Sequence, residues 1–155
     1  MKTFSNRSDT PVLALRRYSL HGQTMGTQYS AVFFADANVD EGNIGVKLFA
    51  VVDAVDRQMS SWKPDSDLNR LNRAPENEWL TIPKQLFKVL ETALLVSKQS
   101  QGAFDIGVGD LVRAWGFGPS KGLTNGQQIG ALKAQIHRPA TDVLEIKPAQ
   151  HQVRK

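Results

Sequence analysis

The sequence has 155 residues, of which 41% are hydrophobic and 22% charged, and its formal net charge is +4. A chain of this length can bury about 68–70% of its unfolded surface, enough for a core, and the composition is not typical of collagen, coiled coils or disordered chains. It contains no cysteine, which excludes disulfides, thiolate metal sites and cysteine nucleophiles. His21, His137 and His151 are far apart in sequence, so we expect surface residues rather than metal ligands.

The excess positive charge lies mainly at the two ends of the chain and forms no stripe of Lys and Arg with exposed aromatic residues. We therefore expect a mildly basic, solvated surface and no nucleic-acid partner. The apolar run Val12–Leu15 is too short for a signal-peptide core, and no stretch approaches the ~20 apolar residues of a spanning helix. The prediction is a cytoplasmic protein without a membrane partner, or a periplasmic one if an export signal was lost.

The first part of the chain predicts an arm and two strands. Residues 1–15 are expected to be a flexible N-terminal arm, because Ser, Asn, Asp and Thr dominate its first ten positions. Residues 16–36 carry a strand signal that a turn at Gly22–Gly26 divides. Both faces become apolar near Phe33 and Phe34, which predicts a strand covered on both sides.

A helix over 39–59 is predicted because apolar residues recur at spacings of three and four, which places them on one core-facing stripe. The stripe comprises Ile44, Leu48, Val51, Val52, Val55 and Met59. Asp53 and Asp56 flank it and are expected to be solvated. A turn follows at Lys63–Ser66, where Ser66 could cap a short helix that carries Leu68 and Leu71.

The second half predicts further helices and then strands. A helix over 83–101 would turn Leu86, Leu90, Ala93, Leu94 and Ser97 inward, with Phe87 beside them, and end at Gly102. Shorter helices are predicted at 107–115 and, from the capping box of Thr124 and Gln127, at 124–135. Strands are predicted at Val143–Lys147 and 151–155, joined by a turn at Pro148–Gln150.

We expect the last strand to be an edge still lacking a partner, which favours a truncated fold. The fold class predicted from these elements is α+β, a mainly antiparallel sheet with helices packed on one side.

Four short segments combine glycine, aromatic and polar residues. They are Thr24-Met25-Gly26-Thr27, Met59-Ser60-Ser61-Trp62 with Pro64-Asp65-Ser66, Gly102-Ala103-Phe104-Asp105, and Trp115-Gly116-Phe117-Gly118. Gly26 and Gly102 permit positive φ or a close approach of another group. Phe104, Trp115 and Phe117 are expected to be core aromatics, with ligand contacts as the alternative.

In order and spacing these segments resemble the N-terminal half of FAD:protein FMN transferases, once called thiamine-biosynthesis lipoproteins. The resemblance covers about residues 18–147, and implies that residues 16–155 are the N-terminal portion of such a domain. Members of this family move FMN from FAD to a threonine of an acceptor protein, release AMP, and use magnesium. The resemblance thus implies FAD as a substrate and a flavoprotein acceptor as a partner.

The resemblance places FAD contacts at Met25, Trp62, Ala103, Phe104 and Asp105. At the position of Trp62 the family usually has tyrosine, so a contact through the tyrosine hydroxyl is in doubt while the flat aromatic face is kept. Alternatives stay open at this point. Met25 could be ordinary strand packing, Trp62 could cover a helix end, and Asp105 could cap the helix at 107–115.

The family's magnesium ligands belong to segments of its C-terminal half that this sequence does not contain. The resemblance therefore implies no catalytic residue and no metal ligand in this chain, which we expect to hold part of the FAD pocket and to be inactive alone. A separate C-terminal half is then a further partner to consider. The alternative is a non-catalytic flavin- or protein-binding module, or a fragment.

Overall fold

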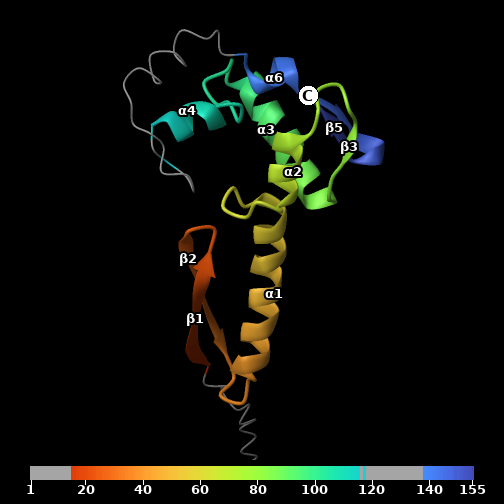
Figure 1. Ribbon diagram of the computed structural model, residues 1–155. Helices are drawn as coiled ribbons and strands as arrows, with labels where there is room; N and C mark the ends of the chain where they lie inside the picture. Colours follow the sequence, from red (N-terminus) through yellow and green to blue (C-terminus); the bar gives the residue numbers. More distant parts are fainter. Residues whose placement is uncertain (1–14, 116, 118–137) are drawn as a thin grey trace, which may run out of the picture. The chain divides into compact units, whose positions relative to one another are not determined.

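A computed structural model describes residues 15–115, 117 and 138–155 (Figure 1). The chain divides into two compact units, Met1–Val51 and Val52–Lys155. The described residues form both helices and strands, and each strand pairing described is antiparallel, so the predicted α+β class with antiparallel sheet is confirmed. The helix predicted at 124–135, and all but the last residue of the arm predicted at 1–15, lie outside the described residues.

The first unit contains a β-hairpin of β1 (Arg16–Thr24) and β2 (Thr27–Ala35). Thr24 pairs with Thr27, so only Met25 and Gly26 form the turn. Their φ angles are 47° and 72°, the positive values that a two-residue type I′ turn requires at both positions. The predicted turn over Gly22–Gly26 was therefore too long, and β1 runs to Thr24.

Gly22 lies inside β1, directly opposite Tyr29 on β2. A Cβ atom at Gly22 would lie 2.6 Å from the Tyr29 hydroxyl oxygen and 2.7 Å from two ring carbons. The tyrosine ring thus occupies the space that a side chain would need. The glycine that the sequence suggested as part of a turn is a strand position over which an aromatic ring packs.

Side chains of β2 alternate between two environments. Phe33 is partly buried and its ring stacks on Tyr18 of β1 with centroids 5.2 Å apart. On the opposite face Val32 is 50% exposed and Phe34 is 63% exposed. The prediction that both faces are covered is therefore wrong for the chain as the structure describes it.

Helix α1 (Glu41–Met59) begins after Asp40, whose Oδ1 accepts the backbone N–H of Asn43 at 2.9 Å. This is the bond of a helix N-cap, in which a side-chain oxygen satisfies a free amide of the first turn. The predicted apolar stripe is partly correct. Met59 packs against the core of the second unit, but Val51 is 64% exposed and does not belong to a core face.

The second unit contains the end of α1 and the remaining elements. They are α2 (Asp67–Arg73), β3 (Leu80–Thr81), α3 (Lys84–Gln99), α4 (Gly109–Ala114), α6 (Ala140–Val143), β4 (Glu145–Lys147), a 3-10 helix (Pro148–Gln150) and β5 (Gln152–Arg154). The sequence missed α6, so Val143 ends a helix rather than beginning a strand. The predicted turn at Pro148–Gln150 is this 3-10 turn.

The three strands of the second unit form a sheet in the order β3-β5-β4. Val153 of β5 pairs with Leu80 on one side and with Ile146 on the other. The last strand is therefore central, and the prediction of an edge without a partner is wrong. β3 was not predicted, because it is two residues long and carries no alternating pattern.

The core of the second unit lies between this sheet and α3. It is formed by Leu71, Ile82, Leu86, Phe87, Leu90 and Val153. The face predicted for the helix at 83–101 is confirmed except at Leu94, which is only partly buried. The buried residues of α3 are Leu86, Phe87, Leu90, Ala93 and Ser97. In the part of the chain that the structure describes, no helix combines the length and apolar character needed to cross a membrane.

Candidate functional site

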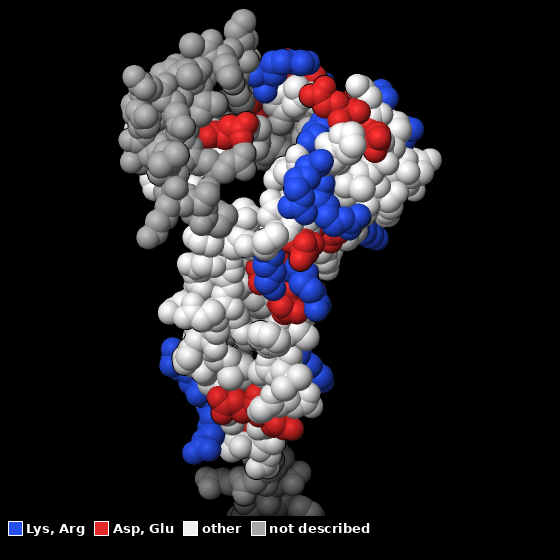
Figure 2. All heavy atoms as spheres, viewed as in Figure 1, with Lys and Arg blue, Asp and Glu red and all other residues white. Residues whose placement is uncertain are grey.

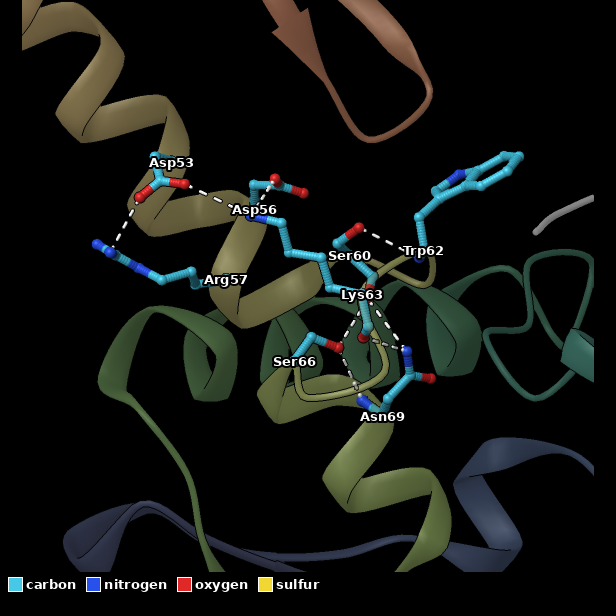
Figure 3. A network of polar contacts seen from close by, with 8 residues as sticks. All are labelled: Asp53, Asp56, Arg57, Ser60, Trp62, Lys63, Ser66 and Asn69. Atoms are coloured by element: carbon cyan, nitrogen blue, oxygen red, sulfur yellow. Dashed lines mark hydrogen bonds and ion pairs between the residues drawn. The ribbon is translucent and has the colours of Figure 1, made fainter.

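The turn between α1 and α2 is fixed by hydrogen bonds to its backbone (Figure 3). The Ser66 hydroxyl donates to the carbonyl oxygen of Ser60 at 2.7 Å and accepts the backbone N–H of Asn69 at 3.1 Å. The second bond confirms Ser66 as the N-cap of α2. Both serines are only 1% exposed, so a polar network lies inside the unit with its hydrogen bonds made.

Trp62 projects from this turn. Its backbone N–H donates to the Ser60 hydroxyl at 3.2 Å, while its side chain is 49% exposed. In Figure 3 the indole points away from the hydrogen-bonded network. The turn therefore exposes a large aromatic ring, while its backbone is fixed by hydrogen bonds to buried serines.

Charged side chains flank the same turn. Lys63 Nζ lies 2.7 Å from Asp56 Oδ2 and 3.4 Å from Asp53 Oδ1, and Arg57 lies 3.0 Å from Asp53 Oδ2. The Asp56 and Asp53 side chains are 13% and 25% exposed, so these expected solvated flanks are only partly exposed and are engaged in ion pairs. Figure 2 shows acidic and basic side chains lying next to one another on the face drawn.

The pairing changes the acidity of both partners. The hydrogen bond from Lys63 is the main cause that lowers the pKa of Asp56, against an opposing effect of burial. The same hydrogen bond raises the pKa of Lys63. Both groups therefore stay charged around neutral pH, and the pair acts as a local electrostatic link between α1 and the turn.

A shallow hollow of about 600 Å³ lies beside the turn. It is lined by Ala54, Arg57, Gln58, Lys63, Pro64, Asp65, Ser66, Asp67 and Pro83. None of the residues for which the sequence predicts an FAD contact is among them.

The segment Gly102–Asp105 follows the end of α3. α3 ends at Gln99, and the left-handed residue after its cap is Gln101 with φ 53°, one position before the predicted stop. Gly102 follows with φ 83°, and its N–H donates to the carbonyl oxygen of Ser97. The backbone N–H of Phe104 donates to the Ser100 hydroxyl at 3.1 Å. Phe104 is nevertheless 44% exposed, so its backbone is held while much of its ring faces solvent.

Asp105 has a structural role. Its Oδ1 accepts the backbone N–H of Gly107 at 2.8 Å and that of Ala140 at 3.1 Å. The first bond lies just before α4, and the second satisfies the first residue of α6. The predicted cap of the helix at 107–115 is not observed, because α4 begins at Gly109 and Asp105 bonds to Gly107 before it. The side chain instead satisfies the first amide of α6 and joins two segments far apart in sequence.

The structure also shows the surroundings of Met25 and of the remaining predicted core aromatics. Met25 lies in the hairpin turn, so ordinary strand packing does not describe it. Trp115 and Phe117 are 55% and 68% exposed, so these residues, like Phe104, are not the core aromatics that were expected.

Four of the five predicted contact residues, Trp62, Ala103, Phe104 and Asp105, belong to the second unit, and Met25 belongs to the first. That they touch FAD stays a prediction.

Sequence reasoning missed Asn69, whose side chain is central to the network of the turn. The signal was present, since a serine N-cap followed three residues later by an amide side chain is a variant of the capping-box pattern. Among the residues that the structure describes, no group of three or more His, Asp or Glu side chains could hold a metal ion.

Comparisons with known proteins agree with the motifs. Residues 25–154 match the model of the ApbE family. FAD:protein FMN transferase from Klebsiella pneumoniae is 34% identical over 119 residues, which are 75% of this chain and 34% of that protein. The protein of the same name from Haemophilus influenzae is 36% identical over 106 residues, 66% of this chain and 31% of that protein.

The fold has solved counterparts. The flavin transferase ApbE from Vibrio cholerae superposes with a TM-score of 0.77 at 26% identity, covering 91% of this chain and 45% of that one. The ApbE protein from Thermotoga maritima, at 19% identity and a TM-score of 0.71, shares the fold. The chain spans about a third of the length of the curated relatives it matches. On the family model, these relatives and the shared fold, the chain belongs to the ApbE family.

Proposed function

We propose that this chain forms part of the FAD site of a FAD:protein FMN transferase. In the reaction, a threonine hydroxyl oxygen of the acceptor protein bonds to the phosphorus of the FMN half of FAD. The pyrophosphate bond breaks, AMP leaves with the bridging oxygen, and the hydroxyl proton is released. Such a transfer depends on positioning and charge neutralisation. The names of the relatives support this activity, because both are FAD:protein FMN transferases.

The observation that carries the proposal is the placement of Trp62. A 49% exposed indole stands on a turn whose backbone is tied to two fully buried serines. An exposed indole on a fixed turn offers a flat face on which a heteroaromatic ligand can stack. A stacked aromatic pair contributes about 0.5–1.5 kcal/mol beyond the area it buries. We therefore assign Trp62 to a face of FAD.

The three residues of the segment Ala103-Phe104-Asp105 have different proposed roles. Ala103 is small and exposed, which lets a ligand approach the backbone, and Phe104 offers a partly exposed apolar ring. Asp105 holds the segment in place through Gly107 and Ala140, and its carboxylate remains a candidate acceptor for a nucleotide donor. Met25, on a tight hairpin turn, is the corresponding proposal for the first unit.

We further propose that the active enzyme contains polypeptide of the family type beyond this sequence. Among the described residues no group of three or more acidic or His side chains could hold a metal ion, and the relatives are about three times as long as the matched part. The first unit also exposes apolar side chains, namely Val32, Phe34, Val46 and Phe49 at 50–69%. Apolar surface of this kind usually marks a contact. The additional polypeptide would cover it, in one chain or as a separate partner.

The experiment is an FAD titration followed by a transfer assay. The 155-residue chain should bind FAD, and Trp62→Ala should weaken binding about 2- to 12-fold, the equivalent of 0.5–1.5 kcal/mol, while Trp62→Phe retains most of it. Leu95→Ala, which removes an exposed apolar side chain from α3, is the control and should leave binding unchanged. With magnesium and a threonine-containing acceptor, the chain alone should show no transfer.

The possible results of the titration and the transfer assay test separate parts of the proposal. Absence of FAD binding, or identical affinities for wild type and Trp62→Ala, refutes the site. Transfer by the isolated chain refutes the claim that further polypeptide is needed. FAD binding that persists, without any transfer, when a C-terminal portion from a longer relative is added favours the second candidate, a non-catalytic flavin-binding module.

A further inference from the structure

We propose that Asn69 is a positioning residue for Trp62, fixing the turn so that the indole is held ready for the flavin. This inference rests on the proposed function, because the ligand it names is FAD. Asn69 is the third residue of α2, and its side chain turns back over the loop that precedes the helix (Figure 3).

The side-chain amide of Asn69 donates to backbone carbonyls on both sides of Trp62 in the chain. Its Nδ2 lies 2.8 Å from the carbonyl oxygen of Lys63, 3.2 Å from that of Ser61 and 3.3 Å from that of Ser60. Ser61 and Lys63 are the two neighbours of Trp62 along the chain. The two amide hydrogens are thus shared among carbonyls on both sides of the indole-bearing residue, and rotation of that backbone would break these bonds.

The amide itself is held in one orientation. The backbone N–H of Asn69 donates to the Ser66 hydroxyl, and the Asn72 side chain lies 3.4 Å from its Oδ1. The Ser66 hydroxyl in turn donates to the carbonyl oxygen of Ser60, one of the acceptors that Asn69 uses. A closed set of bonds therefore joins the helix start to the turn, and the two serines in it are buried.

Packing does not supply this order. With 49% of its side chain exposed, Trp62 is not enclosed by packing, so the hydrogen-bonded backbone of the turn limits where the indole can lie. Ordering a free side chain opposes ligand binding, and a turn already fixed in the free protein removes part of that cost. Simple helix capping would not need this arrangement, because Ser66 already caps α2 without the Asn69 side chain.

The test replaces Asn69 by Asp, which has nearly the same shape but cannot donate hydrogen bonds. A carboxylate in the first turn suits the helix dipole, so α2 should persist. Asn43→Asp is the matched control, since Asn43, like Asn69, is the third residue of its helix. It is exposed, and the cap of its helix is Asp40. Asn69→Ser, which is too short to reach the three carbonyls and adds no charge, is the second variant.

The readout is fluorine NMR of the protein labelled with 5-fluorotryptophan. The chain has three tryptophans, and Trp62→Phe assigns the resonance of Trp62. In Asn69→Asp and Asn69→Ser that resonance should narrow and move toward the shift of the free amino acid. The Trp79 resonance should keep its chemical shift, because Lys147 and Arg154 of the sheet lie over that ring. An unchanged Trp79 resonance therefore reports that the second unit is folded.

An FAD titration completes the experiment. Affinity should fall about 2- to 12-fold in both Asn69 variants and remain at the wild-type value in Asn43→Asp. A Trp62 resonance that neither Asn69 variant changes, in protein whose Trp79 resonance is intact, overturns the positioning role while leaving the proposed function in place. A wild-type protein that binds no FAD overturns the proposed function and with it the ligand named in this proposal.

Discussion

The carboxylate of Asp105 accepts the backbone N–H of Ala140, 35 residues further along the chain, at 3.1 Å. The same oxygen accepts the N–H of Gly107 at 2.8 Å. One side chain therefore satisfies two amides and connects the segment after α3 to the start of α6. Ala140 is 1% exposed, so its amide would lack a solvent partner if the carboxylate were removed.

Asp105→Ala should lower the free energy of unfolding of the second unit by about 1.5–3 kcal/mol, the usual range for hydrogen bonds to a charged group. Asp105→Asn should lower it less, because an amide oxygen can still accept both bonds. The measurement is urea unfolding followed by tryptophan fluorescence, which reports the second unit because it contains all three tryptophans. Glu76→Ala, an exposed loop substitution, serves as control. Equal stability of Asp105→Ala and wild type would contradict the role described.

The ion pair of Asp56 and Lys63 predicts how stability depends on pH. The folded pKa of Asp56 lies below the ordinary value of 3.8, so its contribution is present above that value and is lost as the pH falls through the folded pKa. The folded pKa of Lys63 lies above 10.5, so its contribution is present below that value and is lost as the pH rises further.

The stability difference between wild type and Asp56→Asn should therefore be constant from about pH 5 to pH 9 and shrink at both extremes. Urea midpoints at a series of pH values measure it, with Glu76→Gln as the control carboxylate. A difference that does not change with pH would rule out the pairing as its source.

The core prediction compares two leucines on α3. Leu86 is 1% exposed and Leu95 is 53% exposed, on the same helix. Leu86→Ala removes buried methyl groups and leaves a cavity, so the unfolding free energy of the second unit should fall by about 2–5 kcal/mol. Leu95→Ala should change it by no more than about 0.5 kcal/mol. Similar effects for the two substitutions would show that α3 is oriented differently.

The hairpin prediction concerns Gly22. Gly22→Ala places a methyl group within 2.6–2.7 Å of the Tyr29 ring, so the ring must move and the hairpin should lose about 1–3 kcal/mol. Gly45→Ala in α1 meets no atom within 4 Å and should instead stabilise the helix by about 0.5–1 kcal/mol. Hydrogen exchange of the β1 and β2 amides measures the first effect, and that of the α1 amides measures the second.

A double substitution makes this test specific. In a Tyr29→Ala background the Gly22→Ala change should cost less, because the ring that opposes it is absent. The same loss in both backgrounds would mean that the backbone of β1, rather than the ring, requires glycine at this position.

Periodicity predicted the long elements well. The spacing of Leu86, Leu90, Ala93 and Ser97 identified the buried face of α3, and Ser66 with Leu71 identified α2. The short elements β3 and α6 were not predicted, because two and four residues are too few to show a periodic pattern. Gly22 was misassigned because the Tyr29 ring that explains it lies on another strand, and one sequence position does not show a neighbour across a sheet.

The site was predicted in part. The motif segments located Trp62 and Asp105, but their surroundings depend on tertiary contacts. The Asp105 bond to Ala140 spans a distance in sequence that no local pattern encodes. The exposure of Trp115 and Phe117 was also missed, because aromatic composition alone favours burial.

The position of β5 in the middle of its sheet bears on how the protein acquires its structure during synthesis. Leu80 on β3 pairs with Val153 on β5, and Val153 is completely enclosed. A ribosome emits residues in order, so the nascent second unit lacks its innermost strand until Gln152–Arg154 has been synthesised, after α3 and the other two strands of the sheet. Until then the apolar face of α3 is open to chaperones or to other nascent chains. Loss of Val153 from β5 would leave that apolar face open in the folded unit as well.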